Sequence, residues 1–208
     1  MPMLTIWGRN NSINVQKVLW CCAELGLEFR RIDAGLQYGV NNTPEYLANN
    51  PTGLVPTIDD DGYILWESNV IVRYLSSRHG LGTLCPADLQ ARFRAEIWMD
   101  WQQSFLWPSF RTVFQGLIRT PPEKRDNNAI AAAKGKAASA LKILDRHLAG
   151  RDYVEGKQLT FGDIPVGIAA YRWFALGMPR EELPNMVRWH DRLAERPAFR
   201  QHVMLPLT

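Results

Sequence analysis

Cysteine is scarce in this sequence, which has only Cys21, Cys22 and Cys85 among its 208 residues. An odd number of cysteines, two of them adjacent, excludes a disulfide-stapled scaffold. The sequence has no CxxC pair and no Cys/His spacing typical of zinc ligands, so we expect no metal site. Cys21 and Cys22 fall on an apolar helical pattern and are predicted to be buried as small hydrophobic residues.

Long apolar runs and an excess of one charge are also lacking. No stretch approaches the roughly 18 apolar residues of a membrane span, and Met1 to Trp7 is too short for a signal-peptide core. The net charge is only +3, with basic and acidic residues interspersed, which gives no basic stripe of the kind that nucleic-acid binding needs. We therefore expect a cytoplasmic protein that binds neither membrane nor nucleic acid.

The first eighty residues alternate between strand-like and helix-like patterns. In chain order we expect a strand at Leu4 to Trp7, a helix through Val15 to Leu25, a strand at Glu28 to Asp33, a helix starting at Thr43-Pro44, strands at Thr57 to Asp59 and Tyr63 to Trp66, and a helix through Val70 to Leu75. The first strand–helix–strand unit predicts parallel strands, and the turn at Asp59 to Gly62 predicts an antiparallel hairpin. This order is that of the thioredoxin fold, so we predict an α/β thioredoxin-like domain at 1–80.

The rest of the chain shows no convincing strand pattern. Residues 81–87 are rich in Gly, Leu and Pro and suit a linker, and residues 88–208 are expected to form an all-α domain. Its longest helical pattern, Leu89 to Ile118, contains Pro108, which should kink or break the helix. Thr160 and Asp163 have capping-box spacing, which we interpret as the structural start of a core helix. Further helices are expected through Ala133 to Leu148, Phe161 to Gly177, Pro184 to Glu195 and Pro197 to Val203.

A Val55-Pro56 pair precedes the hairpin strands. Proline cannot donate a hydrogen bond within a sheet, and in a thioredoxin-like layout it lies in cis just before the third strand. A cis bond would let Val55 present its N–H and C=O to an extended peptide, which would pair like an added strand. The alternative is an ordinary trans turn proline.

Glu67 and Ser68 stand at the start of a predicted helix. Free amides and the helix dipole favour an anion there, and the Ser68 hydroxyl can join them in holding a carboxylate. Glu67 can take a ligand ammonium group. Together the two residues suit an amino-acid moiety such as the γ-glutamyl end of glutathione; the alternative is a plain helix cap.

Ser12 lies between the first strand and the first helix, among Asn10, Asn11 and Asn14. A ligand thiol is mostly protonated at neutral pH, and a hydroxyl donor plus helix N-terminal amides stabilise its thiolate. Ser12 is the candidate donor and the three asparagines are alternates. A simple capping role for Ser12 or Asn11 is the competing interpretation.

These segments together resemble the glutathione transferase superfamily. The resemblance rests on Asn50-Pro51-x-Gly53-x-Val55-Pro56, on Trp66-Glu67-Ser68 with Ile71 and Tyr74-Leu75, and on Thr160-x-x-Asp163-Ile164. It implies that Val55 binds the glutathione backbone, that Glu67 and Ser68 bind its γ-glutamyl end, and that the chain forms a homodimer with glutathione as co-substrate.

Within that family the chain is most similar to the Ser-type classes, theta-like and zeta-like. The first tyrosine is Tyr38, too late for the Tyr-type mechanism, and Cys21 lies too far into the helix for a Cys-type mechanism. Leu54 stands where theta-like members carry a lysine, which leaves the glycyl carboxylate of glutathione with one fewer cation. Asn41 or Gln37 is expected to compensate.

The resemblance places the second substrate between the two domains, where apolar pockets tend to form. The candidates facing that cleft are Trp107, Phe110, Arg111 and Phe114, with Trp101 and Phe105 nearby; an aromatic stripe can equally be core. The predicted function is transfer of the glutathione thiolate to a hydrophobic electrophile. A glutathione-dependent disulfide reductase or isomerase and a non-catalytic binding protein are the alternatives.

Overall fold

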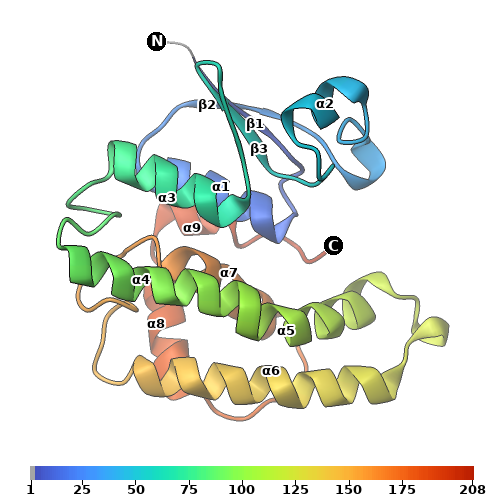
Figure 1. The fold of residues 1–208 in the computed structure, drawn as a ribbon. Coiled ribbons are helices and arrows are strands. Elements are labelled where there is room, and N and C mark those ends of the chain that lie inside the picture. The colour runs from blue at the N-terminus through green and yellow to red at the C-terminus, as the bar shows by residue number, and fades with distance from the viewer. Residues whose placement is uncertain (1–2) are drawn as a thin grey trace.

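The computed structural model describes residues 3–208, and its N-terminal part is built on one four-stranded sheet of order β2-β1-β3-β4 (Figure 1). The strands are β1 (Leu4–Trp7), β2 (Phe29–Ile32), β3 (Thr57–Asp60) and β4 (Tyr63–Trp66). β1 pairs in parallel with β2 and antiparallel with β3, which pairs antiparallel with β4. The predicted parallel unit and the predicted hairpin are both confirmed.

Three helices accompany this sheet: α1 (Ile13–Glu24), α2 (Pro44–Asn49) and α3 (Ser68–His79). Figure 1 shows α1 and α3 side by side between the sheet and the helical half, with α2 away from that interface. Cys21 and Cys22 are fully buried in α1, as predicted. Thr43 caps α2 by accepting a hydrogen bond from the Tyr46 amide, and a 3-10 turn, Leu36–Tyr38, precedes it.

The remainder is helical, as predicted. Its elements are α4 (Leu89–Trp101), α5 (Trp107–Phe114), a 3-10 turn at Pro122–Lys124, α6 (Asn127–His147), α7 (Asp163–Ala175), α8 (Pro184–Ala194) and α9 (Pro197–His202). Helix α7 is the centre of this half, since residues 163–170 are all buried.

Pro108 does not end the long helical stretch that contains it, but a π-helical turn directly before it interrupts the regular α-helix between α4 and α5. Two π-helical turns, Gln102–Leu106 and Gln115–Arg119, join α4 to α5 and extend α5. In the first, the Trp107 amide bonds to the Gln102 carbonyl five residues back. A widened turn of this kind accommodates the proline, which has no N–H and would otherwise clash with the carbonyl four residues earlier. The chain therefore continues helically from α4 through α5.

Asp163 begins α7, and its buried carboxylate accepts four hydrogen bonds. The donors are the amides of Val154 (2.9 Å) and Thr160 (3.0 Å), the Thr160 hydroxyl (3.2 Å) and the Trp189 indole (3.0 Å). Burial raises the pKa of Asp163 to about 6, against these bonds, which lower it. The structural interpretation of this box is confirmed, because Asp163 ties two points of the loop before α7, Val154 and Thr160, to α7 and α8.

The two halves meet where α1 packs on α7 and α9. A side chain at Gly167 would put a Cβ 3.1 Å from the Trp20 ring and 2.9 Å from Leu193, so glycine allows the close approach. Trp20 also packs edge-on against Phe199, with ring centroids 4.8 Å apart. Glu24 joins the halves by accepting bonds from Arg196 at 2.5 and 2.8 Å.

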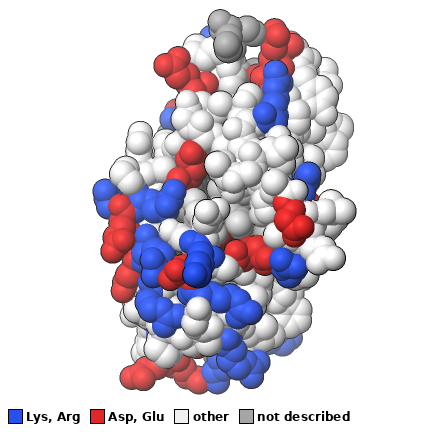
Figure 2. Space-filling view, turned by 90° about the vertical axis from the view of Figure 1, so that its left-hand side faces the viewer, with Lys and Arg blue, Asp and Glu red and all other residues white. Residues whose placement is uncertain are grey.

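Charged residues mix on the face shown in Figure 2, where basic and acidic side chains intermingle over the helical half and the sheet half carries fewer. No helix within residues 3–208 combines the length and apolar character needed to cross a bilayer.

Candidate functional site

A cleft of about 360 Å³ lies where the loop after β1, the segment before β3 and the start of α3 face the helix from Gln103 to Arg119. Its lining residues are Arg9, Ser12, Ile13, Asn14, Leu54, Val55, Glu67, Gln103, Trp107, Arg111, Phe114, Gln115, Arg119 and Arg172. The structure thus brings together, from distant parts of the chain, three of the predicted groups: Ser12, Val55 and Glu67.

The Val55–Pro56 peptide bond is cis, as predicted. Within residues 3–208, neither the Val55 N–H nor its C=O has a hydrogen-bond partner. The preceding Leu54 carbonyl is held by the Tyr46 hydroxyl (2.6 Å) and the Asn50 amide (2.9 Å). The free main-chain groups of Val55 therefore sit on a fixed frame and can pair with an extended peptide.

Glu67 and Ser68 stand at the start of α3; Glu67 lines the cleft, whereas Ser68 beside it does not. Glu67 is the N-cap residue with φ of 71°, a left-handed conformation that costs a non-glycine residue on the order of 1 kcal/mol. Ser68 is buried, with 3% exposure, and no side chain caps the first turn of α3. The open amides of a 12-residue helix are a favourable place for a carboxylate.

Lys17 in α1 is a buried lysine acted on by the Glu67 charge, and the sequence did not predict it. It is 2% exposed, and burial lowers its pKa to about 7, with the Glu67 carboxylate acting in the opposite direction. Its position in α1 among apolar residues gave the only available signal, a lysine on a predicted buried face.

Ser12 is the N-cap residue of α1 and is 6% exposed, and its side chain makes no capping hydrogen bond. The hydroxyl thus remains available to the cleft. Asn14 lines the cleft too, whereas Asn10 is exposed outside it. The Asn11 side-chain amide donates to the Thr208 hydroxyl, and Asn11 is not among the residues that line the cleft. Ser12 and Asn14 therefore remain as candidate donors to a thiol.

The residues expected at the glycyl end are less close together. Leu54 lines the cleft and is 65% exposed. Asn41 instead donates to the Gly53 carbonyl (2.6 Å), and Gln37 is exposed on the 3-10 turn. Neither Asn41 nor Gln37 lines the cleft.

On the helical wall, Trp107, Arg111 and Phe114 line the cleft as predicted, but Phe110 does not. Phe110 is 1% exposed and packs against Trp173 at 6.0 Å between ring centroids, because it lies on the face of α5 turned to the core. Phe105 is exposed over the groove beside α6, and Trp101 is half-buried outside the cleft. Of the aromatic residues predicted to face the cleft, Trp107 and Phe114 therefore line it.

Three arginines of the cleft were not predicted: Arg9, Arg119 and Arg172. Arg172 is 4% exposed, donates to the Asn11 carbonyl (2.8 Å) and the Gln16 side chain (2.9 Å), and lies 4.7 Å from the Phe114 ring centroid. Burial, and then the charges of Arg119 and Arg9, lower its pKa to about 9. No local motif marked these arginines, because they come from a loop, a π-helical turn and α7.

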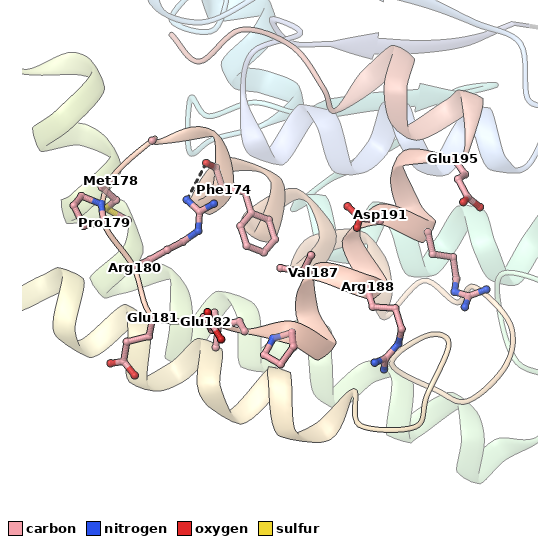
Figure 3. Close-up of a pocket in the computed structure, with 14 residues that line it drawn as sticks. Phe174, Met178, Pro179, Arg180, Glu181, Glu182, Val187, Arg188, Asp191 and Glu195 are labelled. Carbon is pink, nitrogen blue, oxygen red and sulfur yellow. Dashed lines mark hydrogen bonds between the residues drawn. The ribbon is translucent and has the colours of Figure 1, made fainter.

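A second cavity, of about 1070 Å³, lies between the end of α7 and α8 (Figure 3). Phe174, Met178 and Val187 form its apolar floor, while Glu181 and Arg188 point outward around it. None of the residues predicted to bind glutathione lines it, so it is not the predicted glutathione site.

Comparison with known proteins agrees with this geometry. The models of the glutathione S-transferase N-terminal and C-terminal domains match residues 2–77 and 105–197. The chain is 43% identical to the glutathione S-transferase GstB of Escherichia coli K12, covering 99% of this chain and all of the relative. This chain belongs to the glutathione S-transferase family. The family and fold predicted from the sequence are confirmed.

Solved structures give the same result for this transferase. A theta class glutathione S-transferase of Xanthomonas axonopodis pv. citri, solved with glutathione bound, superposes with a TM-score of 0.96 at 44% identity, covering both chains fully. Among sequence relatives, glutathione S-transferase 3 of Zea mays is 30% identical, over 98% of this chain and 94% of the relative.

Proposed function

We propose that this transferase binds glutathione along Val55 and activates its thiol at Ser12 for attack on an electrophile in the cleft. The observation that carries the proposal is the unpaired Val55 main chain beside a Ser12 hydroxyl that makes no capping bond. Glutathione is also the ligand present in the theta class relative from Xanthomonas.

Each part of the tripeptide has a partner in this arrangement. The cysteinyl amide pairs with the Val55 N–H and C=O, and the γ-glutamyl carboxylate takes Ser68 and the amides of α3. Glu67 takes the ligand ammonium group, with Pro56 fixing the turn. The glycyl end extends past Leu54 toward Asn41 and Gln37.

Ser12 would donate to the sulfur and lower the thiol pKa, assisted by the N-terminus of α1. A shift of about two pKa units corresponds to roughly 2.7 kcal/mol, which one charge-assisted hydrogen bond and the helix dipole together can supply. Leu54, Trp107 and Phe114 give the second substrate apolar walls.

Disulfide exchange by the chain's own thiols is disfavoured. Cys21, Cys22 and Cys85 are all buried, and burial raises the pKa of Cys21 to about 12. A thiolate is the reacting species in such exchange, so glutathione must supply the reactive sulfur.

The proposed assembly is a cytoplasmic homodimer. Val70 on α3 and Phe93 and Ile97 on α4 are 43%, 57% and 60% exposed. The Arg73 side chain bridges α3 to Glu96 and Asp100 of α4, which holds the two helices together. An exposed apolar surface of this kind is a common protein–protein contact.

The Ser12→Ala variant tests the mechanism. We expect kcat/KM with a chloronitroaromatic substrate to fall at least about tenfold, or roughly 1.4 kcal/mol of transition-state stabilisation. Calorimetry should still show glutathione binding, because Val55, Glu67 and Ser68 are untouched.

Ser139→Ala on the exposed side of α6, where the hydroxyl only contacts the Gly135 carbonyl, is the control. If Ser12→Ala retains the full rate, thiol activation belongs to Asn14. Absence of glutathione binding to the wild-type protein would refute the proposal as a whole.

A further inference from the structure

Four guanidinium groups converge on the cleft, from Arg9, Arg111, Arg119 and Arg172. Within residues 3–208, no Asp or Glu side chain lies within 4.0 Å of any of the four. Other arginines of the chain do have such partners, including Arg73, Arg78, Arg94, Arg192 and Arg196. The cleft therefore holds four arginine side chains without an acidic partner, whereas many arginines elsewhere in the fold form ion pairs.

Two of these side chains are more than nine-tenths buried and retain unused donors. Arg9 is 9% and Arg172 4% exposed, and the Nε of each lacks a hydrogen-bond partner in the described chain. Leaving a buried charged donor unpaired is costly. A ligand anion is the group that would satisfy them.

The arginines also repel one another. Burial and then Arg119 lower the pKa of Arg9, and burial and then Arg111 lower that of Arg119. Among the lining residues, Glu67 is the only one with a carboxylate. Among the lining side chains one carboxylate faces four guanidinium groups, an imbalance that an incoming anion would reduce.

Aromatic contacts fix the position of the cluster. The Phe114 ring lies 4.7 Å from the Arg172 guanidinium carbon and 5.5 Å from that of Arg119. Arg119 also donates weakly to the Thr208 main-chain oxygen, at 3.3 and 3.4 Å, while the Arg111 side chain has no hydrogen-bond partner within residues 3–208. Arg111 and Arg119 are thus the two most available donors beside the apolar wall of Trp107 and Phe114.

We propose that the second substrate of this transferase is an amphipathic electrophile carrying a carboxylate, which is bound by Arg111 and Arg119 with Arg9 as a third cation lining the cleft. The inference rests on the proposed function, since it assigns the second substrate of that same site. Arg172 donates a hydrogen bond to the Asn11 carbonyl and so positions the loop before α1. Its charge adds to the positive potential of the cleft.

The reaction itself is an ordinary displacement. For a chloronitrobenzoate, the glutathione sulfur forms a bond to the ring carbon that carries chlorine, and the carbon–chlorine bond breaks. Chloride leaves with the bonding electron pair, and the thiol proton passes to solvent. The carboxylate is not consumed; it orients the ring beneath the attacking sulfur.

The carboxylate recognised by the cluster has a second conceivable source, the glycyl end of glutathione. Two conjugates separate the sources: S-benzylglutathione and S-(4-carboxybenzyl)glutathione, which share the tripeptide and differ by one carboxylate. We expect calorimetry to show at least about tenfold tighter binding of the carboxylated conjugate, or about 1.4 kcal/mol.

The advantage should disappear in the Arg111→Gln and Arg119→Gln variants. Arg146→Gln, which removes the same charge from the exposed face of α6, should retain it. Thermal unfolding followed by circular dichroism verifies that each variant is folded.

A substrate pair gives a kinetic readout: 4-chloro-3-nitrobenzoate and 4-chloro-3-nitrobenzamide. Each kcat/KM is divided by the uncatalysed rate constant with glutathione, which removes the intrinsic difference in reactivity. We expect the wild-type ratio of acid to amide to exceed about ten and to fall about tenfold in Arg111→Gln.

Each contrary outcome has a distinct meaning. If both conjugates bind equally, or if the amide is the better substrate, the inference is wrong and the proposed function stands. If the arginine variants weaken free glutathione itself and leave the conjugate ratio unchanged, the cluster binds the glycyl carboxylate and the inference is again wrong. If neither conjugate binds, the proposed function has failed as well.

Discussion

At the scale of single residues, Lys17 is a buried lysine whose charge interacts with that of Glu67 at the proposed site. It lies in α1 a few residues after Ser12, and its amino group is held at 2% exposure within the field of Glu67. Burial disfavours the charged form, so a cation here lowers the stability of the fold. The Glu67 carboxylate acts in the opposite direction and favours the charged lysine.

This arrangement predicts a pH dependence of stability. The pKa of Lys17 falls from 10.5 in the unfolded chain to about 7 in the fold, so between these values the unfolded state binds more protons. The free energy of unfolding should therefore rise with pH above about 7, by up to about 1.4 kcal/mol per pH unit from this group. Below pH 7 both states are protonated and the penalty is constant.

Urea denaturation of the wild-type protein and Lys17→Met at pH 7, 8 and 9 measures the effect. The difference between the two proteins should shrink as the pH rises, whereas the exposed Lys136→Met should track the wild type. Parallel curves for Lys17→Met and the wild type would mean that Glu67 keeps Lys17 charged.

At the scale of elements, the sequence predicted what depends on local pattern. Periodicity located the strands and helices, and the hairpin turn fixed the strand pairing. The π-helical turns were not predicted because the long helical pattern of residues 89–118 does not reveal an inserted residue. A π-helical turn also changes which side chains after it face the cleft. For this reason Phe110, which was predicted to face the cleft, lies in the core.

The site residues divide in the same way, into those found from local sequence pattern and those that only the tertiary structure brings together. Val55, Pro56, Glu67 and Ser12 stand next to strand or helix ends and were found from those positions. The cluster of Arg9, Arg119 and Arg172 depends on tertiary packing, including that of α1 against α7, which no short motif encodes.

The start of α7 gives a prediction at this scale. Asp163→Ala leaves four donors without their acceptor in the interior, so we expect a loss of about 3 kcal/mol in the free energy of unfolding. The comparison is Asp126→Ala, which removes an exposed cap that accepts only from the Ala129 amide at 2.9 Å. That change should cost about 1 kcal/mol. Equal losses in chemical denaturation would show that the buried network adds nothing beyond an ordinary cap.

At the scale of the whole molecule, the exposed apolar residues of α3 and α4 set the expected assembly. Phe93 and Ile97 are four residues apart and share one face of α4. We expect Phe93→Glu combined with Ile97→Glu to convert a dimer to a monomer in sedimentation velocity, because charges at the centre of an apolar contact lose their hydration. Val187→Glu, at 43% exposure over the other cavity, should leave the dimer intact. A wild-type monomer would contradict the proposed assembly.

The contact at Gly167 has a consequence for recombination among relatives. The indole of Trp20 fits against α7 only because the helix offers bare backbone there, at 3.1 Å from a would-be Cβ. A chimaera that takes the sheet half from this chain and the helical half from a relative with a larger residue at that point would force the two apart. The residue at position 167 should therefore decide whether the halves of such enzymes can be exchanged. A library of hybrids should be selected for glycine at this position before any catalytic residue is considered.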